Sequence, residues 1–418
     1  MQTNLADLVK DTREGKEADA ILRTCVHCGF CLATCPTYQL LDDELDSPRG
    51  RIYLMKEVLE GQVATQKTQL HLDRCLTCRA CETACPSGVR YGRLVDICRN
   101  VVEKQVERSV KTKIVRYALR QILPNSSVFM VLLKIGQAVR SFLPKEVRGL
   151  VPSKSRNAGI WPPARHKRKM LVLDGCVQPS IAPNINTATA RILDKIGISL
   201  IKVEKENCCG AISYHLNAQQ EGLDYMRRNI DAWWPYCDNN LEHGVEAIVM
   251  TASGCGVTVK EYGSYLNHDH IYSEKAARIS ELTKDISEIL EHEAEQLTPL
   301  FNNVESCTKK SKLTFHSPCT LQHGLQINGV VESILTAAGF DLTFVQDSHI
   351  CCGSAGTYSI LQPKLSKQLL KNKIKILESD KPDQIVTANI GCLAHLQSGT
   401  PFIIKHWIEV LDEKLHNH

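Results

Sequence analysis

The sequence predicts a multidomain protein of the α and α/β classes, with an N-terminal helical domain followed by two tandem copies of one α/β domain. Two short cysteine runs lie in the first quarter of the chain, and one pattern of strands, helices and cysteines occurs twice in the C-terminal half. A basic, cysteine-free stretch separates the two parts. At 418 residues with 43% hydrophobic content, the chain can form two or three domains with cores of their own. We expect these domains at residues 1–112, 169–300 and 311–418, with a connector at 113–168.

The N-terminal cysteines form two runs with the spacing C-x2-C-x2-C-x3-C-P, which is typical of bacterial ferredoxins with two [4Fe–4S] clusters. Three thiolates at intervals of two residues can surround one cluster through a tight loop, whereas the fourth reaches the neighbouring cluster. Zinc also binds CxxC pairs, but a regular array of four thiols plus proline, found twice, favours iron–sulfur clusters. We therefore predict cluster 1 on Cys25, Cys28, Cys31 and Cys85, and cluster 2 on Cys75, Cys78, Cys81 and Cys35.

The segment between the two runs predicts a helix, because apolar residues recur there at helical spacing. These residues are Ile52, Met55, Val58 and Leu59. A second helix is expected over 93–106, so the cluster-binding domain should be mostly helical. Arg49 and Arg51 precede the first stripe. They either lie near a cluster and raise its potential by favouring the extra electron, or belong to a solvated turn.

The repeat in the C-terminal half runs from a β-branched segment ending in a cysteine, through Cys-Cys-Gly, to another segment ending in Gly-Cys. In both copies 31 residues separate the first cysteine from the double cysteine. A helix and a strand are expected in that interval: the strands at 199–203 and 342–345, and the helices on the apolar residues Ala188, Ile192, Leu193 and Ile196, and Val330, Ile334, Leu335 and Ala338. Alternating strands and helices indicate a parallel α/β unit, whose binding crevice lies at the carboxyl ends of the strands.

The cysteines of the repeat fall just after the expected strands, which makes them candidates for a further metal or redox site. They are Cys176, Cys208, Cys209 and Cys255 in the first copy, and Cys319, Cys351, Cys352 and Cys392 in the second. Four thiols per copy can hold a cluster or zinc; the alternative is a duplicated fold with inert thiols. Three nearby histidines are either ligands or ordinary polar partners: His215, His323 and His395. The remaining cysteines, Cys98, Cys237 and Cys307, are interpreted as ordinary thiols.

The connector carries the charge asymmetry of the chain. Residues 101–170 contain 16 lysines and arginines against 3 acidic residues, a net charge of +13, and the rest of the chain has a net charge of −9. A helix is expected over 126–143, with Val128, Val131, Leu132, Ile135, Val139 and Phe142 on one face. This helix either lies on an anionic membrane or packs on the α/β domains.

The chain begins without an apolar signal segment, and its longest apolar run, Val128 to Leu133, is far too short to span a bilayer. We therefore expect a cytoplasmic protein, in which clustered cysteines serve as metal ligands rather than as disulfides. There is no GxGxxG motif and no other flavin or nicotinamide fingerprint. We expect neither catalytic residues in this chain nor a nucleic-acid partner.

These motifs together identify a family resemblance. The double ferredoxin run joined to two CCG cysteine-rich domains resembles the heterodisulfide-reductase-like iron–sulfur subunits of flavin dehydrogenases. Longer stretches are similar to the glycolate oxidase (glycolate dehydrogenase) iron–sulfur subunit family: CVHCGFCLATCPTYQLLDDELDSPRGRIYLMKEVLEG, HLDRCLTCRACETACPSGVRY, DSHICCGSAGTYS and VTANIGC. In the fuller family pattern each CCG domain ends in CxxC, which supports a non-cubane cluster. Here that motif reads Cys255-Gly-Val-Thr and Cys392-Leu-Ala-His, so an extra cubane, zinc or no metal all remain open.

The resemblance implies an electron-transfer subunit of a multisubunit, flavin-dependent glycolate oxidase. Its partner subunits would bind FAD and oxidise glycolate to glyoxylate, and this chain would pass electrons singly to a quinone or another acceptor. Such a subunit would lie peripherally on the cytoplasmic face of the inner membrane. Two alternatives share the layout: the iron–sulfur subunit of an anaerobic glycerol-3-phosphate dehydrogenase, and a thiol/disulfide reductase whose CCG site is itself catalytic.

Overall fold

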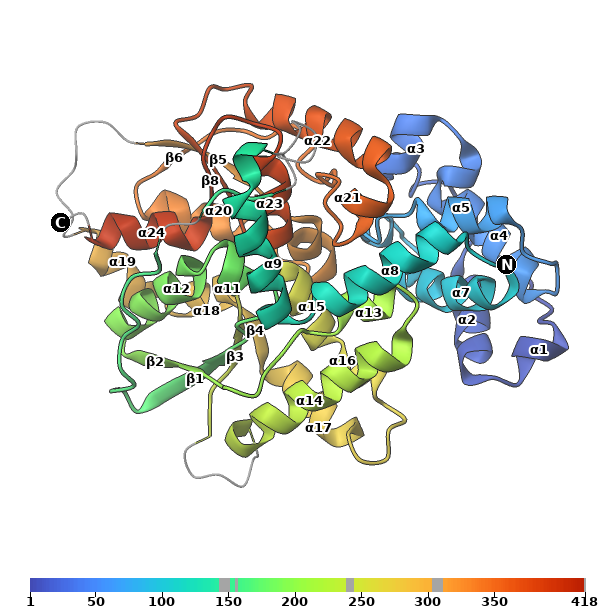
Figure 1. Cartoon of the computed structure of the whole chain (residues 1–418), viewed down its shortest axis with the longest axis horizontal. Helices are drawn as coiled ribbons and strands as arrows, with labels where there is room; N and C mark the ends of the chain where they lie inside the picture. The colour runs from blue at the N-terminus through green and yellow to red at the C-terminus, as the bar shows by residue number, and fades with distance from the viewer. Residues whose placement is uncertain (143–150, 155–156, 238–243, 303–310, 417–418) are drawn as a thin grey trace.

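The computed structural model of the chain describes residues 1–142, 151–154, 157–237, 244–302 and 311–416. A helical N-terminal domain lies beside two α/β units, each built around its own four-stranded sheet (Figure 1). The predicted fold class, multidomain α and α/β with an internal repeat, is confirmed. The predicted domain limits stay predictions.

The N-terminal domain consists of short helices around the two cysteine runs. Its elements are α1 (Asp7–Lys10), α2 (Arg13–Thr24), α3 (Pro36–Leu41), η1 (Glu44–Asp46), α4 (Pro48–Leu59), α5 (Gln66–Asp73), α6 (Ala80–Thr83) and α7 (Tyr91–Gln105). The helix expected from the apolar stripe is α4, which begins at Pro48 after an N-cap at Ser47. The helix expected over 93–106 is α7. Met55, Leu59 and Leu94 are fully buried where α4 and α7 pack together.

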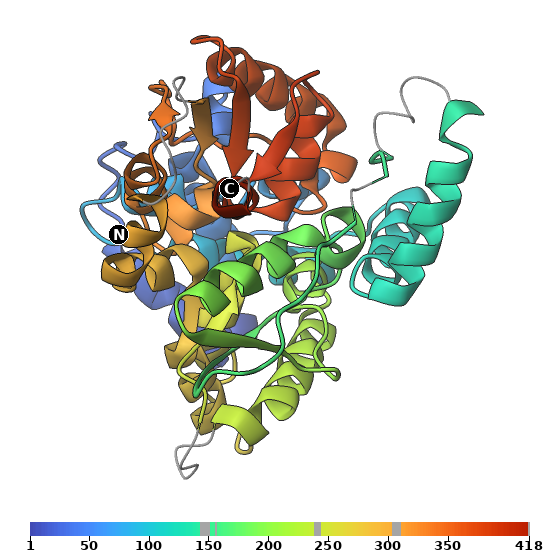
Figure 2. The same cartoon turned by 90° about the vertical axis from the view of Figure 1, so that its left-hand side faces the viewer.

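The connector forms two helices that stand to one side of the body, α8 (Val110–Ile122) and α9 (Ser126–Ala138), followed by the 3-10 turn η2 (Arg140–Phe142) (Figure 2). Neither helix buries a single residue. Residue 143, the last of the helix expected from the sequence, lies outside the described residues. No helix in the described part of the chain has the length and apolar character needed to cross a bilayer.

The first repeat is a parallel sheet in the order β2-β1-β3-β4 with helices on both faces. Its elements are β1 (Arg168–Val172), α11 (Gln178–Ile181), α12 (Asn184–Lys195), β2 (Ile198–Lys202), α13 (Ala211–His215), α14 (Gln219–Cys237), β3 (Ile248–Met250), α15 (Ser253–Lys260), α16 (Tyr262–Tyr265), α17 (Ser273–Leu282), β4 (Thr283–Asp285), α18 (Ile286–His292) and α19 (Ala294–Asn302). β1 lies in the middle, with Leu171 beside Ile201 of β2 and Ile248 of β3.

The second repeat has the same topology, with the parallel order β6-β5-β7-β8. Its elements are β5 (Lys312–His316), η3 (Thr320–Gly324), α20 (Val330–Ala337), β6 (Asp341–Leu342), α21 (Tyr358–Leu361), α22 (Pro363–Leu377), β7 (Gln384–Thr387), α23 (Ile390–Gln397), β8 (Ile404–His406) and α24 (Trp407–His416). Two sheets with one strand order, formed by segments of matching cysteine spacing, confirm the internal repeat that the sequence predicts.

Two strand predictions are corrected by the structure. The strand expected over 342–345 is shorter and ends at Leu342, because β6 is an edge strand held by β5 alone and the chain then turns towards the double cysteine. The segments expected to end in Gly-Cys instead end at Met250 and Thr387. Cys255 and Cys392 therefore lie in the first turns of α15 and α23, where backbone N–H groups are free of helical partners.

The two repeats share one continuous apolar core, in which α12 of the first packs against α24 of the second. Arg191 pairs there with Asp412. Close to the cysteines, the amide of Gly254 donates to Asn389 Oδ1 at 3.2 Å, so the ends of β3 and β7 face each other. The packing therefore fixes the two double-cysteine sites relative to one another.

Candidate functional site

The cysteines predicted for cluster 1 line one cavity. Cys25, Cys28, Cys31 and Cys85 all face this cavity, together with Cys81. Its outer wall is open, because Cys28 is exposed and its neighbours Val26 and Phe30 are 66% and 64% exposed. Burial raises the pKa of the Cys31 thiol to about 11, so a bound metal must displace that proton.

A second cavity adjoins the first and is lined by Cys35, Cys75, Cys78 and Cys81. Cys81 and Tyr91 line both cavities, so the two sites lie next to each other. Here Cys35 and Cys81 are buried, and burial raises the pKa of the Cys78 and Cys81 thiols. The structure thus brings the last cysteine of each run to the cavity of the other run, the arrangement expected for exchanged fourth ligands.

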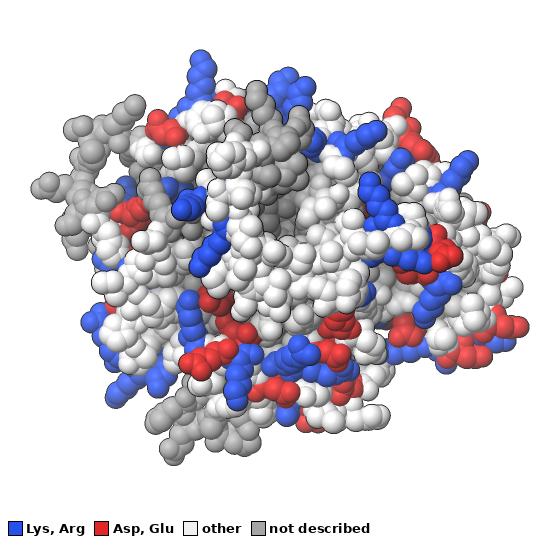
Figure 3. Space-filling model, viewed as in Figure 1, with Lys and Arg blue, Asp and Glu red and all other residues white. Residues whose placement is uncertain are grey.

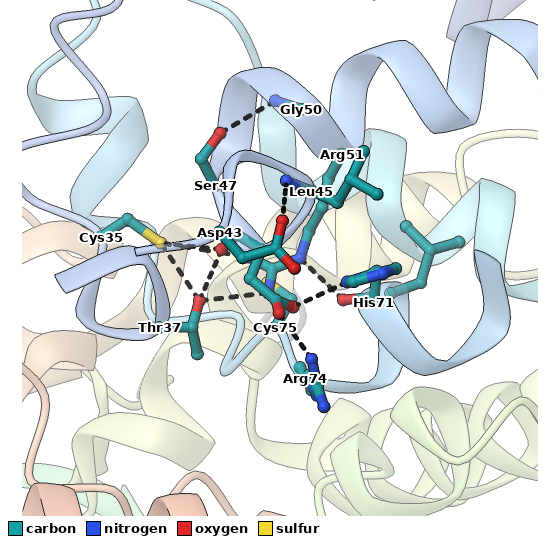
Figure 4. Close-up of polar contacts among 12 residues, drawn as sticks. Cys35, Thr37, Asp43, Leu45, Ser47, Gly50, Arg51, His71, Arg74 and Cys75 are labelled. Carbon is teal, nitrogen blue, oxygen red and sulfur yellow. Dashed lines mark hydrogen bonds and ion pairs between the residues drawn. The ribbon is translucent and has the colours of Figure 1, made fainter. Parts of the chain in front are cut away.

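Arg51 reaches into the second cavity from α4 as a fully buried cation (Figure 4). Its Nη1 lies 3.9 Å from Cys35 Sγ, its Nε donates to the His71 carbonyl at 2.7 Å, and its Nη2 donates to Thr37 at 3.1 Å. A solvated turn, the second interpretation of the sequence, is therefore wrong for Arg51. Arg49 differs, since its side chain is partly exposed at the rim of the first cavity and pairs with Glu44 at 2.8 Å.

Asp46 is the residue at this site that the sequence did not single out. Its carboxylate is fully buried and accepts from Arg51 at 3.1 Å and from Arg74 at 2.6 Å, while His71 Nδ1 lies 3.1 Å away. Two arginines satisfy the charge of this carboxylate. Asp46 therefore orients Arg51 towards the cysteine, and no periodicity or motif marks it in advance.

The cysteines of the second repeat come together in one series of contacts. Cys319 Sγ lies 3.8 Å from Cys351 Sγ, and Cys352 interacts with both Cys351 and Cys392. Backbone and side-chain donors point at the sulfurs: the amide of Gly353 donates to Cys351 at 3.4 Å, and Asn389 donates to Cys392 at 3.4 Å. The neighbouring Cys351 thiol and burial raise the pKa of Cys319.

The first repeat arranges its four thiols in the same order. Cys208 interacts with Cys176 and Cys209, and Cys209 also interacts with Cys255. Here hydrogen bonds from Cys208 and Cys255 lower the pKa of Cys209. The pKa of the equivalent cysteine of the second repeat, Cys352, is raised instead. Each repeat therefore brings together the four thiols singled out in its sequence.

The three candidate histidines each have protein partners. His215 Nδ1 lies 3.2 Å from Asp96, His323 contacts Thr83 at 3.0 Å and the His349 carbonyl at 3.1 Å, and His395 Nε2 contacts Ser366 at 3.2 Å. The expected role as polar partners accounts for all of these contacts.

The other cysteines are buried thiols away from the sites described above. Burial raises the pKa of Cys98 in the N-terminal core, and raises that of Cys237 to about 12. Cys307 lies outside the described residues.

The N-terminal domain touches the two repeats in different ways. Against the first repeat it makes polar contacts, since Arg79 pairs with Glu261 and Arg93 donates to the Tyr214 hydroxyl at 2.7 Å. Against the second repeat the contact includes the hydrogen bond between Thr83 and His323 and an apolar, sulfur-rich cluster: Leu76 is buried with Cys351 and Tyr358, and Cys78 and Cys319 pack beside them. The second cavity therefore adjoins the thiols of the second repeat.

The connector helices expose an apolar face with basic neighbours. Val110, Ile114, Val131 and Ile135 are all more than half exposed, and Figure 3 shows a largely uncharged area over α8 and α9. Lys111, Lys113 and Lys134 are exposed on the same helices. α9 lies against α11 of the first repeat, although no residue of α8 or α9 is fully buried. Both interpretations of this segment therefore stay predictions.

The donor chemistry of the two N-terminal cavities fits iron–sulfur clusters. Sulfur is the main donor at both cavities, and Cys28 is the exposed cysteine among those that line them. No carboxylate lines either cavity, so hard oxygen-seeking cations are not matched by these walls.

Comparisons with known proteins agree with this geometry. The 4Fe-4S dicluster domain family matches residues 21–89, and the CCG cysteine-rich domain family matches residues 170–260 and 313–397. The chain is 53% identical over 415 residues to the glycolate oxidase iron–sulfur subunit of Escherichia coli K12, covering 99% of both chains. It belongs to the glycolate oxidase iron–sulfur subunit family.

Two further relatives widen this family. A probable glycolate oxidase iron–sulfur subunit of Bacillus subtilis is 29% identical over 407 residues, covering 90% of this chain and 89% of that protein. Lactate utilization protein A of Anoxybacillus flavithermus is 25% identical over 248 residues, which is 57% of this chain and 97% of that protein.

Proposed function

We propose that this chain is the electron-transfer subunit of a flavin-dependent glycolate oxidase, and that two [4Fe–4S] clusters carry the electrons. The observation that carries the proposal is the pair of adjoining thiol-lined cavities, with the exposed Cys28 at the first and only buried or partly buried cysteines at the second. Two adjoining sites, one of them with an exposed cysteine, form a path for electrons from the surface inwards. The 53% identity to a glycolate oxidase subunit favours glycolate over glycerol 3-phosphate.

The predicted ligand sets are kept in this proposal: Cys25, Cys28, Cys31 and Cys85 for cluster 1, and Cys75, Cys78, Cys81 and Cys35 for cluster 2. Bound clusters supply one-electron redox chemistry. The chain's own residues hold the thiolates, exclude water with the apolar walls and compensate charge with Arg51, 3.9 Å from Cys35. A fixed cation beside a thiolate stabilises the state with the extra electron.

Substrate chemistry would belong to partner subunits that bind FAD and oxidise glycolate to glyoxylate. A flavin can accept two electrons and release them one at a time. The exposed rim at Val26 and Phe30 gives the partner an apolar contact next to cluster 1. Electrons would leave the complex to a quinone or another acceptor.

The connector helices would hold the complex on the cytoplasmic face of the inner membrane. Exposed apolar residues beside lysines are typical of helices that lie in an anionic interface. Replacing Lys111, Lys113 and Lys134 with glutamine should release the complex from vesicles that contain anionic lipid. Binding that is unchanged by these substitutions and by salt would contradict the membrane assignment.

The electron-transfer role is tested by replacing Cys78 with serine in the assembled complex. Glycolate should still bleach the flavin anaerobically, whereas steady-state reduction of the acceptor should be lost. Cys98→Ala is the matched control, because this cysteine lies in the same domain but lines neither cavity. Loss of flavin bleaching in a complex that remains assembled and FAD-loaded, or glycolate oxidation by this chain alone, would contradict the proposal.

The ligand exchange between runs is tested separately with Cys35→Ser. The spectrum of cluster 2 should change, because Cys35 lines the cavity of Cys75 and Cys78. Cys85→Ser should change the spectrum of cluster 1. If Cys35→Ser changed the spectrum of cluster 1 and Cys85→Ser that of cluster 2, each cysteine run would supply all four ligands of its own cluster.

A further inference from the structure

Tyr91 is a buried tyrosine on the wall that the two thiol-lined cavities share. It is the first residue of α7, only 3% of its surface is exposed, and it lines both cavities, as Cys81 does. Its amide donates to the Val89 carbonyl at 2.8 Å. Its phenol oxygen, by contrast, is buried and has no hydrogen-bond partner among the described residues.

An unpaired phenol in a protein interior is unfavourable. Burying a hydroxyl without a hydrogen bond costs free energy that phenylalanine at the same position would not. A phenol has one proton to donate, and burial raises the pKa of Tyr91, so the hydroxyl keeps this proton at neutral pH. Tyr91 is therefore a donor for which the described part of the polypeptide supplies no acceptor.

The other polar side chains of the second cavity already have protein partners. Thr37 donates to a backbone carbonyl at 2.8 Å, and Thr77 does so at 2.7 Å. The guanidinium groups of Arg51 and Arg79 are paired with carboxylates. Among the described residues that line this cavity, Tyr91 alone has a buried side-chain donor without an acceptor. Its acceptor is therefore expected within the cavity.

The first cavity has a different unpaired atom. His27 lines that cavity, and its buried Nδ1 lacks a partner within the described ranges, but the residue is only partly buried and its Nε2 lies 2.7 Å from the Met1 sulfur. His27 does not line the second cavity, whereas Tyr91 does. The phenol of Tyr91 is thus the unpaired group to be considered at cluster 2.

The charges around the phenol also belong to the second site. Burial is the first cause that raises the pKa of Tyr91, and the charges of Cys75, Cys81 and Cys35 raise it further, whereas Arg51 lowers it. All three cysteines are predicted ligands of cluster 2 and line its cavity. Lining and charge therefore agree that the hydroxyl faces the second site.

The sulfurs of an iron–sulfur cluster accept hydrogen bonds, and these bonds are one of the factors that set its potential. A reduced cluster carries one more negative charge, and hydrogen bonds to charged acceptors are stronger than those to neutral ones. We infer that the Tyr91 hydroxyl donates a hydrogen bond to a sulfur of cluster 2 and thereby raises the potential of this cluster. The inference rests on the proposed function, in which clusters occupy both cavities.

The hydrogen bond would help electrons to move inwards. Burial of the second site opposes an added negative charge, and Arg51 from α4 and Tyr91 from α7 offset this effect from two separate helices. When one electron passes from cluster 1 to cluster 2, the first is oxidised and the second is reduced, with no bond made or broken. A raised potential at cluster 2 favours this direction of transfer.

A redox titration followed by electron paramagnetic resonance tests the inference on the anaerobically purified full chain. Tyr91→Phe keeps the ring and removes only the hydroxyl. At a given potential, the ratio of reduced to oxidised cluster 2 should fall about fivefold, a shift of about 40 mV for a one-electron couple. Cluster 1 should keep its wild-type potential. An unchanged or higher potential of cluster 2, or a shift confined to cluster 1, would overturn the inference.

Tyr358 of the second repeat provides the matched control. This tyrosine is also buried, its hydroxyl likewise lacks a partner in the described part of the chain, and it packs in the cluster of Leu76 and Cys78. It lines neither cavity, however. Tyr358→Phe should leave both potentials unchanged. A shift equal to that of Tyr91→Phe would mean that repacking, rather than a hydrogen bond inside the cavity, changes the potential.

Electron–nuclear double resonance in H2O and D2O detects the hydrogen bond directly. One exchangeable proton coupled to reduced cluster 2 should be present in wild type and in Tyr358→Phe, and absent in Tyr91→Phe. Retention of this proton in Tyr91→Phe would show that water or another group donates instead, and would contradict the inference.

The inference and the proposed function fail in different ways. The titration uses a chemical reductant, so the effect of Tyr91→Phe does not depend on glycolate. If the hydrogen bond is absent, glycolate still reduces both clusters in the assembled complex. If the electron-transfer function is wrong, glycolate reduces neither cluster, whatever potential the titration gives.

Discussion

The two CCG repeats have the same strand order and the same four cysteines, yet their surroundings differ at nearly every point that affects charge. The second repeat packs Cys319 and Cys351 beside Leu76 and Cys78, a predicted ligand of cluster 2, and buries Lys373 on α22. The first repeat meets the N-terminal domain through Arg79 and Glu261, and buries Asn229 at the place of the lysine. A duplicated motif thus supplies the same four thiols twice, whereas neighbouring elements give the two copies different surroundings.

The largest expected effect separates the copies by electron flow. Cys351→Ser with Cys352→Ser should slow steady-state acceptor reduction by about a hundredfold, roughly 2.7 kcal/mol in the barrier, because Cys351 is buried in the cluster against which Cys78, a predicted ligand of cluster 2, packs. Cys208→Ser with Cys209→Ser should change the rate by less than about threefold, which is under roughly 0.7 kcal/mol. The measurement is glycolate-dependent reduction of the acceptor by the assembled complex. Equal losses in both variants would remove the functional difference between the copies.

The last residues of the fourth strands, Asp285 and His406, should give the copies opposite pH dependence. Burial raises the pKa of Asp285 to about 6 and lowers that of His406 to about 3. Asp285 therefore contributes stability below its unfolded pKa near 4 that is lost as pH rises through about 6, roughly 2 kcal/mol between pH 4 and pH 7. His406 contributes stability above its unfolded pKa of about 6.5 that is lost as pH falls below it.

Unfolding free energies measured across that pH range check this contrast. Asp285→Asn keeps a side chain that can accept from the Ser287 amide, 2.9 Å away in the wild type, and should become more stable than wild type as pH rises. His406→Gln should be less stable than wild type at neutral pH. This difference in unfolding free energy should shrink as pH falls. Parallel pH profiles for both variants would contradict the assigned environments.

The glycines that follow the double cysteines should behave alike in the two copies. Gly210 and Gly353 have φ values of 91° and 90°, and a Cβ on either would meet a backbone carbonyl below 3 Å. Each Gly→Ala substitution should therefore cost about 2 kcal/mol of stability. Denaturant unfolding of the two single variants measures this. If the losses of unfolding free energy in the two variants differed by more than this predicted cost, the two repeats would not be structurally equivalent at these glycines.

The smallest expected effect sharpens the comparison between the two buried cations, Arg51 at cluster 2 and Lys373 at the second repeat. Arg51→Gln should lower the potential of cluster 2 by about 60 mV, a tenfold change for a one-electron couple, because it removes a cation that favours the reduced state. The signal of cluster 1 should stay at its wild-type potential during the same titration. A shift of cluster 1 instead would reassign the cavity that Arg51 serves.

Much of the cysteine chemistry could be predicted because ligand spacing is a local property. The runs at Cys25 and Cys75 predict two clusters, and the repeat of Cys-Cys-Gly predicts two similar sheets with their cysteines beyond the strand ends. The helix of α4 follows from apolar periodicity in the same way. The prediction of strand length over residues 342–345 was wrong. β6 ends at Leu342 because its pairing at the edge of the sheet, rather than β-branched composition, limits its length.

The sequence by itself determined the kinds of element, the candidate ligand residues and the duplication, since these depend on spacings within short segments. Only the tertiary structure decided that Lys373, one of several lysines on α22, is buried, and that Asp46 orients Arg51. Cys78 and Cys319 are 241 positions apart and pack against the same buried cluster, a relation that no periodicity can reveal. Charge compensation and proximity arise from packing between domains, so they become visible only when the chain is folded.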